Sequence, residues 1–489
     1  MIERNSSETV LIWYSLFGYL TAQVSGLMEE NAALKEKLAR YESKERNNSK
    51  NTSQPPSKDQ KPAFTEKDTD VKQKATKPVQ AYNGREKTGR KPGGQQGHEG
   101  KTLTKEDVQK LINEGEVCHE IVNHGVLSSK DDYVVRYELT LECVPKVVEH
   151  RFSRFCVIPT EYNSGVVYGS NVKDLATLLH AAHHVSLDRV SSILSHITNG
   201  LVAPSKGTIY RFLEEFAHKS LPEYISILGK SINAPIIYTD GTHITVNGKR
   251  GNVRNVSTQN TVFYEFLPTK SKASLSETLV LPFHKGTEVH DHETTIYNFG
   301  TEHGECNAHT LRYLRKTLED TGHMWPNLFM SLLTGWQGIK ETAISQGRKV
   351  LSIAAYTVMK EEYDTILALG WAENKQLDGL IGMHHAWKQE AALLNRLKNY
   401  GKNILLYLYD FDVDFTNNRS ERDLRFIKGH LKMSGGFRSK RGVKLFCRFQ
   451  TVYQTLKKIG QDTTDCIKKI FARDAEKIDG FSACLPCLA

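Results

Sequence analysis

The sequence predicts a multidomain α+β protein, and three observations support that prediction. A heptad pattern near the N-terminus is followed by a long polar and basic segment that cannot bury a core. Further along, short apolar strand patterns alternate with helical periodicity. Near the C-terminus, a helix rich in arginine and lysine carries an isolated glutamate. The chain has 489 residues, which suffices for roughly two or three domains.

Composition excludes several classes of protein. No apolar run reaches the roughly 18–20 residues that a membrane-spanning helix requires. The longest run, Val10–Leu20, is too short and lacks the basic flank of a signal peptide. The eight cysteines are too unevenly spaced for a disulfide framework. We therefore expect a reduced, cytoplasmic protein that does not associate with a membrane.

Positive charge is concentrated in two segments. The net charge of the chain is +9, whereas segments 44–101 and 415–458 alone carry +7 and +10. The rest of the chain is therefore acidic. Two basic segments on an otherwise acidic protein favour a polyanionic partner, nucleic acid above all, although basic runs are often only solvated surface.

Residues 1–44 show apolar positions with the 4-3 spacing of a coiled coil, from Val10 to Tyr41. Asn31 falls at an a position, where a buried amide favours a parallel two-stranded register. The pattern predicts a homo-oligomer held together by a leucine-zipper-like helix. The alternative is a single amphipathic helix that packs on its own domain.

Residues 45–102 form the polar and basic segment, and we predict a linker that is disordered when free. Its glycine-rich stretch, 89–100, follows no strand, which argues against a phosphate-cradling loop of a nucleotide site. Arg90 and Lys91 in this stretch are candidates for DNA backbone contacts, which salt would weaken.

Residues 103–168 contain two alternating stretches, 133–143 and 146–156, which predict paired strands in a β-rich region. Six residues of the segment have side chains that can bind zinc: Cys118, His119, His124, Cys143, His150 and Cys156. None of them forms the CxxC pairs of a structural zinc site, so zinc stays an open alternative.

Residues 169–230 have helical periodicity throughout. Ser205–Thr208 opens the last helix, and the arrangement fits a helix-turn-helix domain. His180, His183 and His184 have the i, i+3, i+4 spacing of metal ligands on one helix face. No HExxH-type glutamate accompanies them, so packing or surface positions are the favoured interpretation.

Residues 231–312 contain a series of strand patterns with short turns. The patterns are 235–240, 243–247, 251–257 and 262–267, then a helical stretch near 272–281 and a further strand at 287–293. Asp240 ends the first of these strands, and Asp291 lies near the end of the last. This order suits the first part of an RNase H-like α/β core.

Two further segments complete the predicted core. Helical periodicity over 313–405 predicts an insertion, and residues 406–465 supply the second part of the core. Residues 466–489 are predicted to be a C-terminal tail. Cys306 and His309 precede the insertion with C-x2-H spacing, which two metal ligands can have. Because two ligands make only a weak site, a structural role is the favoured interpretation.

Glu421 lies in the basic helix near the C-terminus. Asn417 precedes it as a natural N-cap, and Leu424 and Ile427 belong to an inward-facing apolar stripe. Glu421 falls at the edge of that stripe. One interpretation is a solvated helix in which Glu421 pairs with Arg425 at i, i+4 spacing. The other is a carboxylate directed into a site.

Asp240, Asp291 and Glu421 together match the chemistry of phosphodiester cleavage. Attack by water or a 3′-hydroxyl needs an ionised nucleophile and a stabilised leaving oxygen, and two Mg²⁺ ions can provide both. Mg²⁺ prefers hard oxygen ligands, so three carboxylates suffice, and Mn²⁺ can substitute. Five basic residues of the same helix are candidates for contacts with DNA phosphates: Arg419, Arg422, Arg425, Lys428 and Lys432.

Several motifs resemble those of the insertion-sequence-66 family of bacterial transposases. They are Asp240-Gly-Thr-His, Val289-His-Asp291-His, Cys306-Asn-Ala-His309, the stretch 416–425, the stretch 51–57 and Gly93-Gly-Gln-Gln-Gly-His98. The resemblance spans nearly the whole chain. It implies a DDE transposase, with an RNase H-like core that cleaves element ends and joins them to target DNA. It also implies that Asp240, Asp291 and Glu421 are the metal ligands.

The same resemblance implies the surroundings of this activity. We expect an N-terminal zipper, a zinc-finger-like DNA-binding region at 103–168 and companion proteins encoded by the same element. The substrate would be DNA, and the location the bacterial nucleoid. Two alternatives stay open. One is an RNase H-like nuclease or resolvase without strand transfer, and the other is a non-catalytic, transposon-derived DNA-binding protein.

Overall fold

The computed structural model describes the following parts of the chain: 34–35, 37–38, 104–122, 135–138, 143–153, 158–159, 162, 164–375 and 384–473. They belong to two compact units. One unit includes Thr160–Ser191 and Pro204–Ala489, and the other includes Gly84–Pro159 and Ser192–Ala203.

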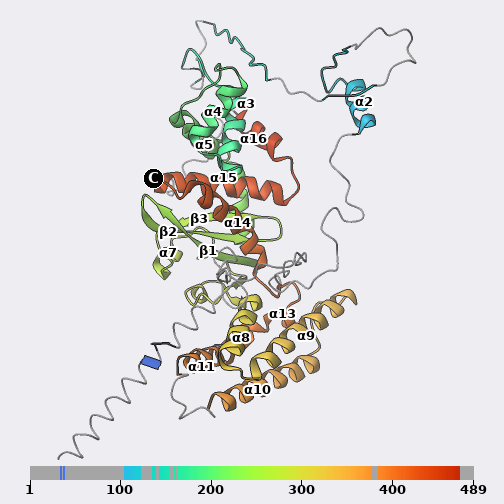
Figure 1. The fold of residues 1–489 in the computed structure, drawn as a ribbon, viewed down its shortest axis with the longest axis vertical. Coiled ribbons are helices and arrows are strands. Elements are labelled where there is room, and N and C mark those ends of the chain that lie inside the picture. Colours follow the sequence, from blue (N-terminus) through green and yellow to red (C-terminus); the bar gives the residue numbers. More distant parts are fainter. Residues whose placement is uncertain are drawn as a thin grey trace, which may run out of the picture. The chain divides into compact units, whose positions relative to one another are not determined.

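A mixed five-stranded sheet forms the centre of the larger unit, with the strand order β3-β2-β1-β4-β5 (Figure 1). The strands are β1 (Ile236–Val246), β2 (Lys249–Ser257), β3 (Val262–Leu267), β4 (Thr287–His290) and β5 (Glu302–Glu305). The first three strands are antiparallel to one another. β4 pairs parallel with β1, and β5 pairs parallel with β4.

The predicted strands 235–240 and 243–247 are a single strand, β1, so Asp240 lies within a strand rather than at its end. Asp-Gly is a common turn pair, but here β2 pairs with residues on both sides of Asp240 and keeps the backbone extended. The hairpin turn comes later, at Asn247 and Gly248. Both have positive φ, 48° and 72°, which is the conformation that a two-residue type I′ turn requires.

Two helices from the C-terminal part pack on the sheet. α14 (Asn418–Ser434) contacts β1 and β2, and α15 (Lys440–Lys458) contacts β3. β3 is an edge strand, and its free N–H groups are satisfied by this helix. Thr451 and Thr455 accept hydrogen bonds from the backbone of Tyr264 and Val262, at 3.0 and 3.1 Å. The helix thereby covers an edge that would otherwise be open to another strand.

The segment that precedes the sheet is helical, as its periodicity indicates. Its elements are α3 (Ser170–Thr177), the π-helix η3 (Leu178–Ala182), α4 (Leu187–Ile197), α5 (Lys206–Lys219) and α6 (Leu221–Ile232). Ser205 is the N-cap of α5, and its side chain accepts a hydrogen bond from the Thr208 backbone. This confirms the predicted start of that helix.

The predicted C-terminal tail does not begin at residue 466. A helix, α16 (Thr463–Phe471), runs through that point and contacts α3 and α5. Its residues Ile467, Ile470 and Phe471 are buried. The three apolar positions lie on one helix face, and burial of that face explains why the segment is ordered structure rather than tail.

Helices also fill the segment between the two parts of the predicted core. They are α8 (Asn307–Thr321), α9 (Trp325–Ser345), α10 (Ile353–Lys375), α11 (His384–Asn399), α12 (Gly401–Ile404) and α13 (Leu406–Tyr409). Short elements α7 (Lys272–Ser276) and η4 (Ile296–Asn298) flank β4. The core of the helices includes the fully buried Trp325, Phe329 and Leu394, and it continues to Tyr238 and Val289 of the sheet. The helices and the sheet therefore share one core.

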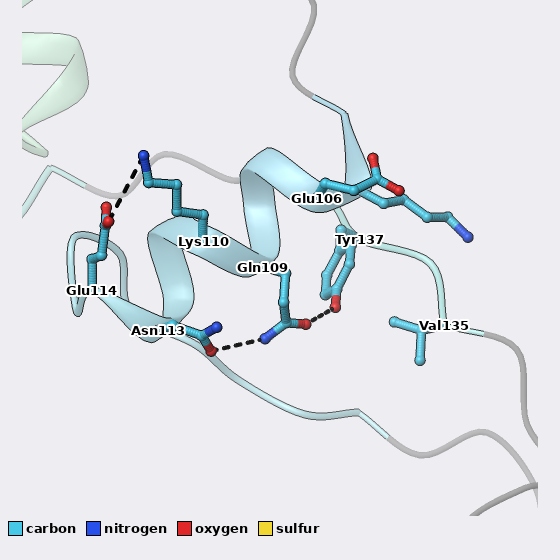
Figure 2. A pocket seen from close by; sticks show the side chains of 8 residues that line it. Glu106, Gln109, Lys110, Asn113, Glu114, Val135 and Tyr137 are labelled. Carbon is cyan, nitrogen blue, oxygen red and sulfur yellow. Dashed lines mark hydrogen bonds and ion pairs between the residues drawn. The ribbon is translucent and has the colours of Figure 1, made fainter.

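In the smaller unit, the described residues of the two predicted strands, 135–138 and 143–153, have no strand structure. Val144 and Val147 are 82% and 92% exposed, so the alternating pattern has no layer to pack against. The unit instead contains α2 (Lys105–Asn113), whose N-cap Thr104 forms a capping box with Asp107. Figure 2 shows the shallow pocket beside this helix.

Several predictions concern residues largely outside the described parts of the chain. Of the predicted coiled coil, 1–44, only Leu34, Lys35, Lys37 and Leu38 are described, and they are helical. The basic linker with Arg90 and Lys91 lies outside entirely. Among the helices that are described, none combines the length and apolar character that a bilayer-spanning segment needs.

Candidate active site

The pairing of β1 with β4 brings two of the predicted acids to neighbouring positions. Thr239 of β1 is the register partner of His290, the last residue of β4. Asp240 and Asp291 each follow directly, on strands that lie about 4.8 Å apart. Asp291 therefore stands where the sequence predicts it, beyond the end of a buried strand.

The start of α14 is fastened to the same end of the sheet. Asn417 occupies the N-cap position, but its side chain does not cap the helix. The Asn417 amide instead donates to the Thr239 carbonyl at 2.9 Å, and the Asn417 backbone N–H donates to Cys306 Sγ at 3.1 Å. These bonds hold Glu421, one turn into the helix, beside the two strands.

Asn255 of β2 makes a second link between the helix and the sheet. It is fully buried, and its Oδ1 accepts bonds from the Ser420 hydroxyl at 2.7 Å and from the Asp240 backbone N–H at 3.3 Å. Its Nδ2 donates to the Ser420 carbonyl at 3.0 Å. One amide thus connects the residue before Glu421 to Asp240.

Four side chains form a group that could hold a metal ion: Asp291, Cys306, His309 and Glu421. Their ligand atoms all lie within 4.8 Å of one another. His309 Nδ1 lies 3.1 Å from Asp291 Oδ1 and 3.8 Å from Glu421 Oε1. Cys306 caps α8, and His309 follows one helical turn later, so both side chains reach the same site.

Several polar atoms of this group are buried without a hydrogen bond of ordinary geometry, although His309 Nδ1 and Asp291 Oδ1 face each other as an ion pair. The atoms without such a bond are Asp291 Oδ1, Glu421 Oε1 and His309 Nδ1, joined by Oδ1 of the neighbouring Asn417. Buried polar atoms in folded proteins nearly always have a partner, because an unpaired one is costly. Two such carboxylate oxygens close to one another are what a bound cation would satisfy.

The two aspartates differ in their pKa. Burial and the neighbouring charge of Asp291 raise the pKa of Asp240 to about 6. Burial alone would also raise the pKa of Asp291, but contact with His309 prevails and lowers it. Burial would lower the pKa of His309, but the contacts with Asp291 and Cys306 raise it to about 11. Asp291 is therefore the more readily ionised of the two acids.

The donor set contains two kinds of ligand atom. The carboxylate oxygens of Asp291 and Glu421 suit Mg²⁺ or Mn²⁺. The thiol of Cys306 and the imidazole of His309 suit softer ions such as Zn²⁺. Asp240 is not one of the four, although its charge acts on Asp291. The residues present fit a divalent cation, and the donors leave its identity open.

The exposed face of α14 is basic. Its four exposed cations are Arg422, Arg425, Lys428 and Lys432. The charge of Lys428 reaches Asp240 and lowers its pKa. Arg419 differs from them, because it is bonded to Asp414 at 3.0 Å and lies over the Tyr238 ring. Of the predicted inward stripe of Leu424, Ile427 and Leu431, the first two are fully buried, whereas Leu431 is half-buried and His430 is buried beside it.

The sequence predicts Asp240, Asp291 and Glu421 as metal ligands and favours a structural role for Cys306 and His309. Their C-x2-H spacing at a helix start was the available signal. The structure brings both residues into the group with Asp291 and Glu421. It contains no ion pair between Glu421 and Arg425 among the described residues.

As a class, this is a mixed α+β protein with a candidate metal site at one end of its sheet and a basic helix beside it. The chain belongs to the Transposase IS66 family, whose model matches residues 166–445. The match includes the sheet, Asp240, Asp291, Glu421 and the helices between them. Membership makes the chain a transposase, a protein that acts on DNA. A search among curated proteins found no match.

Proposed function

We propose that this protein is a DDE transposase that cleaves DNA at the ends of its element and transfers the strands into target DNA. Its RNase H-like core would use Asp240, Asp291 and Glu421 as ligands for Mg²⁺ or Mn²⁺. The observation that carries the proposal is the convergence of Asp291 and Glu421, 130 residues apart, next to the stretch of β1 that holds Asp240. Family membership supports it independently.

The bound ions would supply an ionised nucleophile and charge stabilisation at the leaving oxygen. The protein's own residues prepare the place for that chemistry. Asp291 and Glu421 present buried oxygens that accept no hydrogen bond of ordinary geometry from the described residues, although His309 Nδ1 lies 3.1 Å from the Asp291 oxygen. His309 faces both carboxylates and balances their charge. Asn255 and Asn417 fix the helix that carries Glu421 against the strand that carries Asp240.

The exposed cations of α14 would bind the phosphates beside the cleaved bond. Arg422, Arg425, Lys428 and Lys432 lie on the helix that also carries Glu421, so they would fix the position of the strand rather than read its sequence. Arg419 is engaged with Asp414, and its role would be to hold the approach to α14. Arg90 and Lys91 would add contacts from the linker.

The N-terminal helix would provide the oligomer, and companion proteins of the element would complete the assembly.

The test is a cleavage and joining assay with the purified full chain, Mg²⁺ and the DNA that flanks its gene. We expect Asp291→Asn to reduce end cleavage by more than about 10³-fold, because it removes a metal ligand without changing the shape of the side chain. DNA binding by the variant, measured by mobility shift, should remain.

Wild-type cleavage rates in Asp291→Asn would sink the assignment of the site. The joining step distinguishes the proposed transposase from a nuclease or resolvase. A nuclease or resolvase would cleave the ends but would not link pre-cleaved 3′-hydroxyls to new DNA. Absence of any metal-dependent nicking by the wild-type protein would favour a non-catalytic DNA-binding role instead.

A further inference from the structure

A second buried acid, Glu305 at the end of β5, lies close to the turn that carries Asp291. Its side chain is fully buried, and both of its oxygens are bonded. Oε1 accepts hydrogen bonds from His292 Nδ1 and from the Tyr297 hydroxyl, the latter at 2.6 Å. Oε2 accepts two bonds from the Arg396 guanidinium, at 2.7 and 3.1 Å. Glu305 is not part of the group that could hold a metal.

These bonds fix the residues on both sides of Asp291. His292 is bonded to Glu305 directly. His290 is held through Tyr297, because the two rings are in edge-to-face contact at 4.9 Å and the Tyr297 hydroxyl bonds Glu305. The turn that carries Asp291 is thus anchored before and after the aspartate.

The turn that carries Asp291 is also held by a residue of β2, which lies on the other side of β1 from β4 and β5. Glu293 pairs with Arg254 of β2 at 2.6 Å, and the Arg254 side chain is only 2% exposed. Arg254 also donates to the Thr239 hydroxyl at 3.1 Å, next to Asp240. With both neighbours bonded, the backbone of Asp291 has little freedom to rotate its carboxylate away from Glu421.

Arg396 connects this anchor to the helices. It lies on α11 and stacks over the Tyr313 ring of α8 at 5.1 Å. Tyr400, just beyond α11, contacts the rings of His292 and Tyr297 at 4.7 and 4.9 Å. Residues at α8 and α11 therefore pack against the side chains that hold the Asp291 turn.

We propose that Glu305 is a positioning residue for the metal site: it orients Asp291 through His292 and Tyr297, and through Arg396 it makes that orientation depend on α11. This inference rests on the proposed function, in which Asp291 binds the metal. Partners that orient a metal ligand typically change metal affinity 10–100-fold when they are lost, although they do not touch the ion.

The experiment measures Mn²⁺ binding to the full-length protein by electron paramagnetic resonance, without DNA. Glu305→Gln keeps the shape of the side chain but removes the charge that pairs with Arg396. We expect it to weaken Mn²⁺ binding roughly 10–100-fold. The Mg²⁺ concentration for half-maximal cleavage should rise by the same factor, and saturating Mg²⁺ should restore the maximal rate.

The chain offers a matched control in Glu390 of α11. It is also fully buried, and it accepts bonds from Trp325 Nε1 at 2.6 Å, His323 at 2.7 Å and Asn374 at 2.8 Å. It lies within the helices, with no bond to the Asp291 turn. Glu390→Gln should therefore leave Mn²⁺ affinity unchanged, although it disturbs a buried network of the same kind.

Two results would overturn the inference. One is wild-type Mn²⁺ affinity in Glu305→Gln, and the other is an equal loss in Glu390→Gln, which would indicate general destabilisation. If Glu305→Gln does not fold, Arg396→Gln removes the same ion pair by changing the residue on α11. The same loss of Mn²⁺ affinity is then expected in Arg396→Gln. Asp291→Asn separates the two proposals: if it too binds Mn²⁺ normally, the metal site itself is misassigned.

Discussion

Two acidic clusters lie a few residues apart at the same end of the sheet, and they differ in how their oxygens are bonded. Around Glu305, each oxygen has at least two donors from the chain itself. Around Asp291 and Glu421, one buried oxygen on each carboxylate accepts no hydrogen bond of ordinary geometry from the described residues, and His309 Nδ1 faces these oxygens at 3.1 and 3.8 Å. The acids also differ in burial, because the Glu305 side chain is fully buried, whereas those of Asp291 and Glu421 are 30% and 19% exposed. A buried acid whose oxygens all accept hydrogen bonds contributes to the fold. A pair of acids with buried oxygens that accept no hydrogen bond, beside a histidine, can instead bind a cation from solution.

A third buried acid shows that unpaired oxygens alone do not indicate a metal site. Glu288 of β4 is fully buried, and neither of its oxygens has a partner. It has no place in the metal-capable group. Burial raises its pKa to about 8, so at neutral pH it is largely protonated and uncharged. What distinguishes the active-site candidates is therefore a second carboxylate within reach of the same point.

The largest effects on activity and stability are expected when a glutamate of each kind of cluster is replaced by glutamine. Glu421→Gln should abolish cleavage, yet change the free energy of unfolding by less than about 1 kcal/mol without metal, because its buried oxygen has no hydrogen bond to lose. Glu390→Gln should lower that free energy by about 3 kcal/mol, because it breaks a buried, fully bonded network. Chemical denaturation in a chelator, followed by tryptophan fluorescence, measures both.

The comparison fails if these two variants behave alike. Strong destabilisation by Glu421→Gln would show that the carboxylate supports the fold. A neutral effect of Glu390→Gln on stability would show that its bonds contribute little.

A smaller effect is expected from Glu288 as a dependence of stability on pH. Its folded pKa, about 8, lies above the ordinary value of 4.5. Between these values the folded state holds a proton that the unfolded state has lost, so stability falls as pH rises, by about 1.4 kcal/mol per pH unit. Glu288→Gln should remove that slope between about pH 5 and pH 7.5. Denaturation curves across this range provide the measurement.

The control for this prediction is Glu265, which is buried separately and has a pKa raised to about 7 by burial. It remains in the variant and contributes its own loss of stability with rising pH, which ends near pH 7. An unchanged pH slope in Glu288→Gln would mean that Glu288 is ionised in the folded protein.

Local pattern was sufficient to predict some elements and not others. The start of α5, the inward stripe of α14 and the position of Asp291 after β4 follow from neighbouring residues. Asp240 was misplaced because Asp-Gly favours a turn, whereas pairing with β2 before and after Asp240 keeps the strand extended. The described residues of the strands predicted in 133–156 have no strand structure for the converse reason, since Val144 and Val147 are exposed rather than packed.

The organisation of the site depended on contacts that no local pattern contains. Glu305 and Arg396 are 91 positions apart, and Asn255 and Ser420 are 165 apart. Cys306 and His309 reach Asp291 only because β4 and β5 are parallel neighbours. The sequence could therefore point to the acids and to His309 as candidates, but not to the contacts that Asn255 and Glu305 make with distant residues.

The most direct test of the metal site is a crystal structure of the protein with Mn²⁺, located by its anomalous scattering. We predict an ion at about 2.1–2.3 Å from oxygens of both Asp291 and Glu421. An ion held by Cys306 and His309 without Glu421 would contradict the account, and so would a protein that takes up no ion at this end of the sheet.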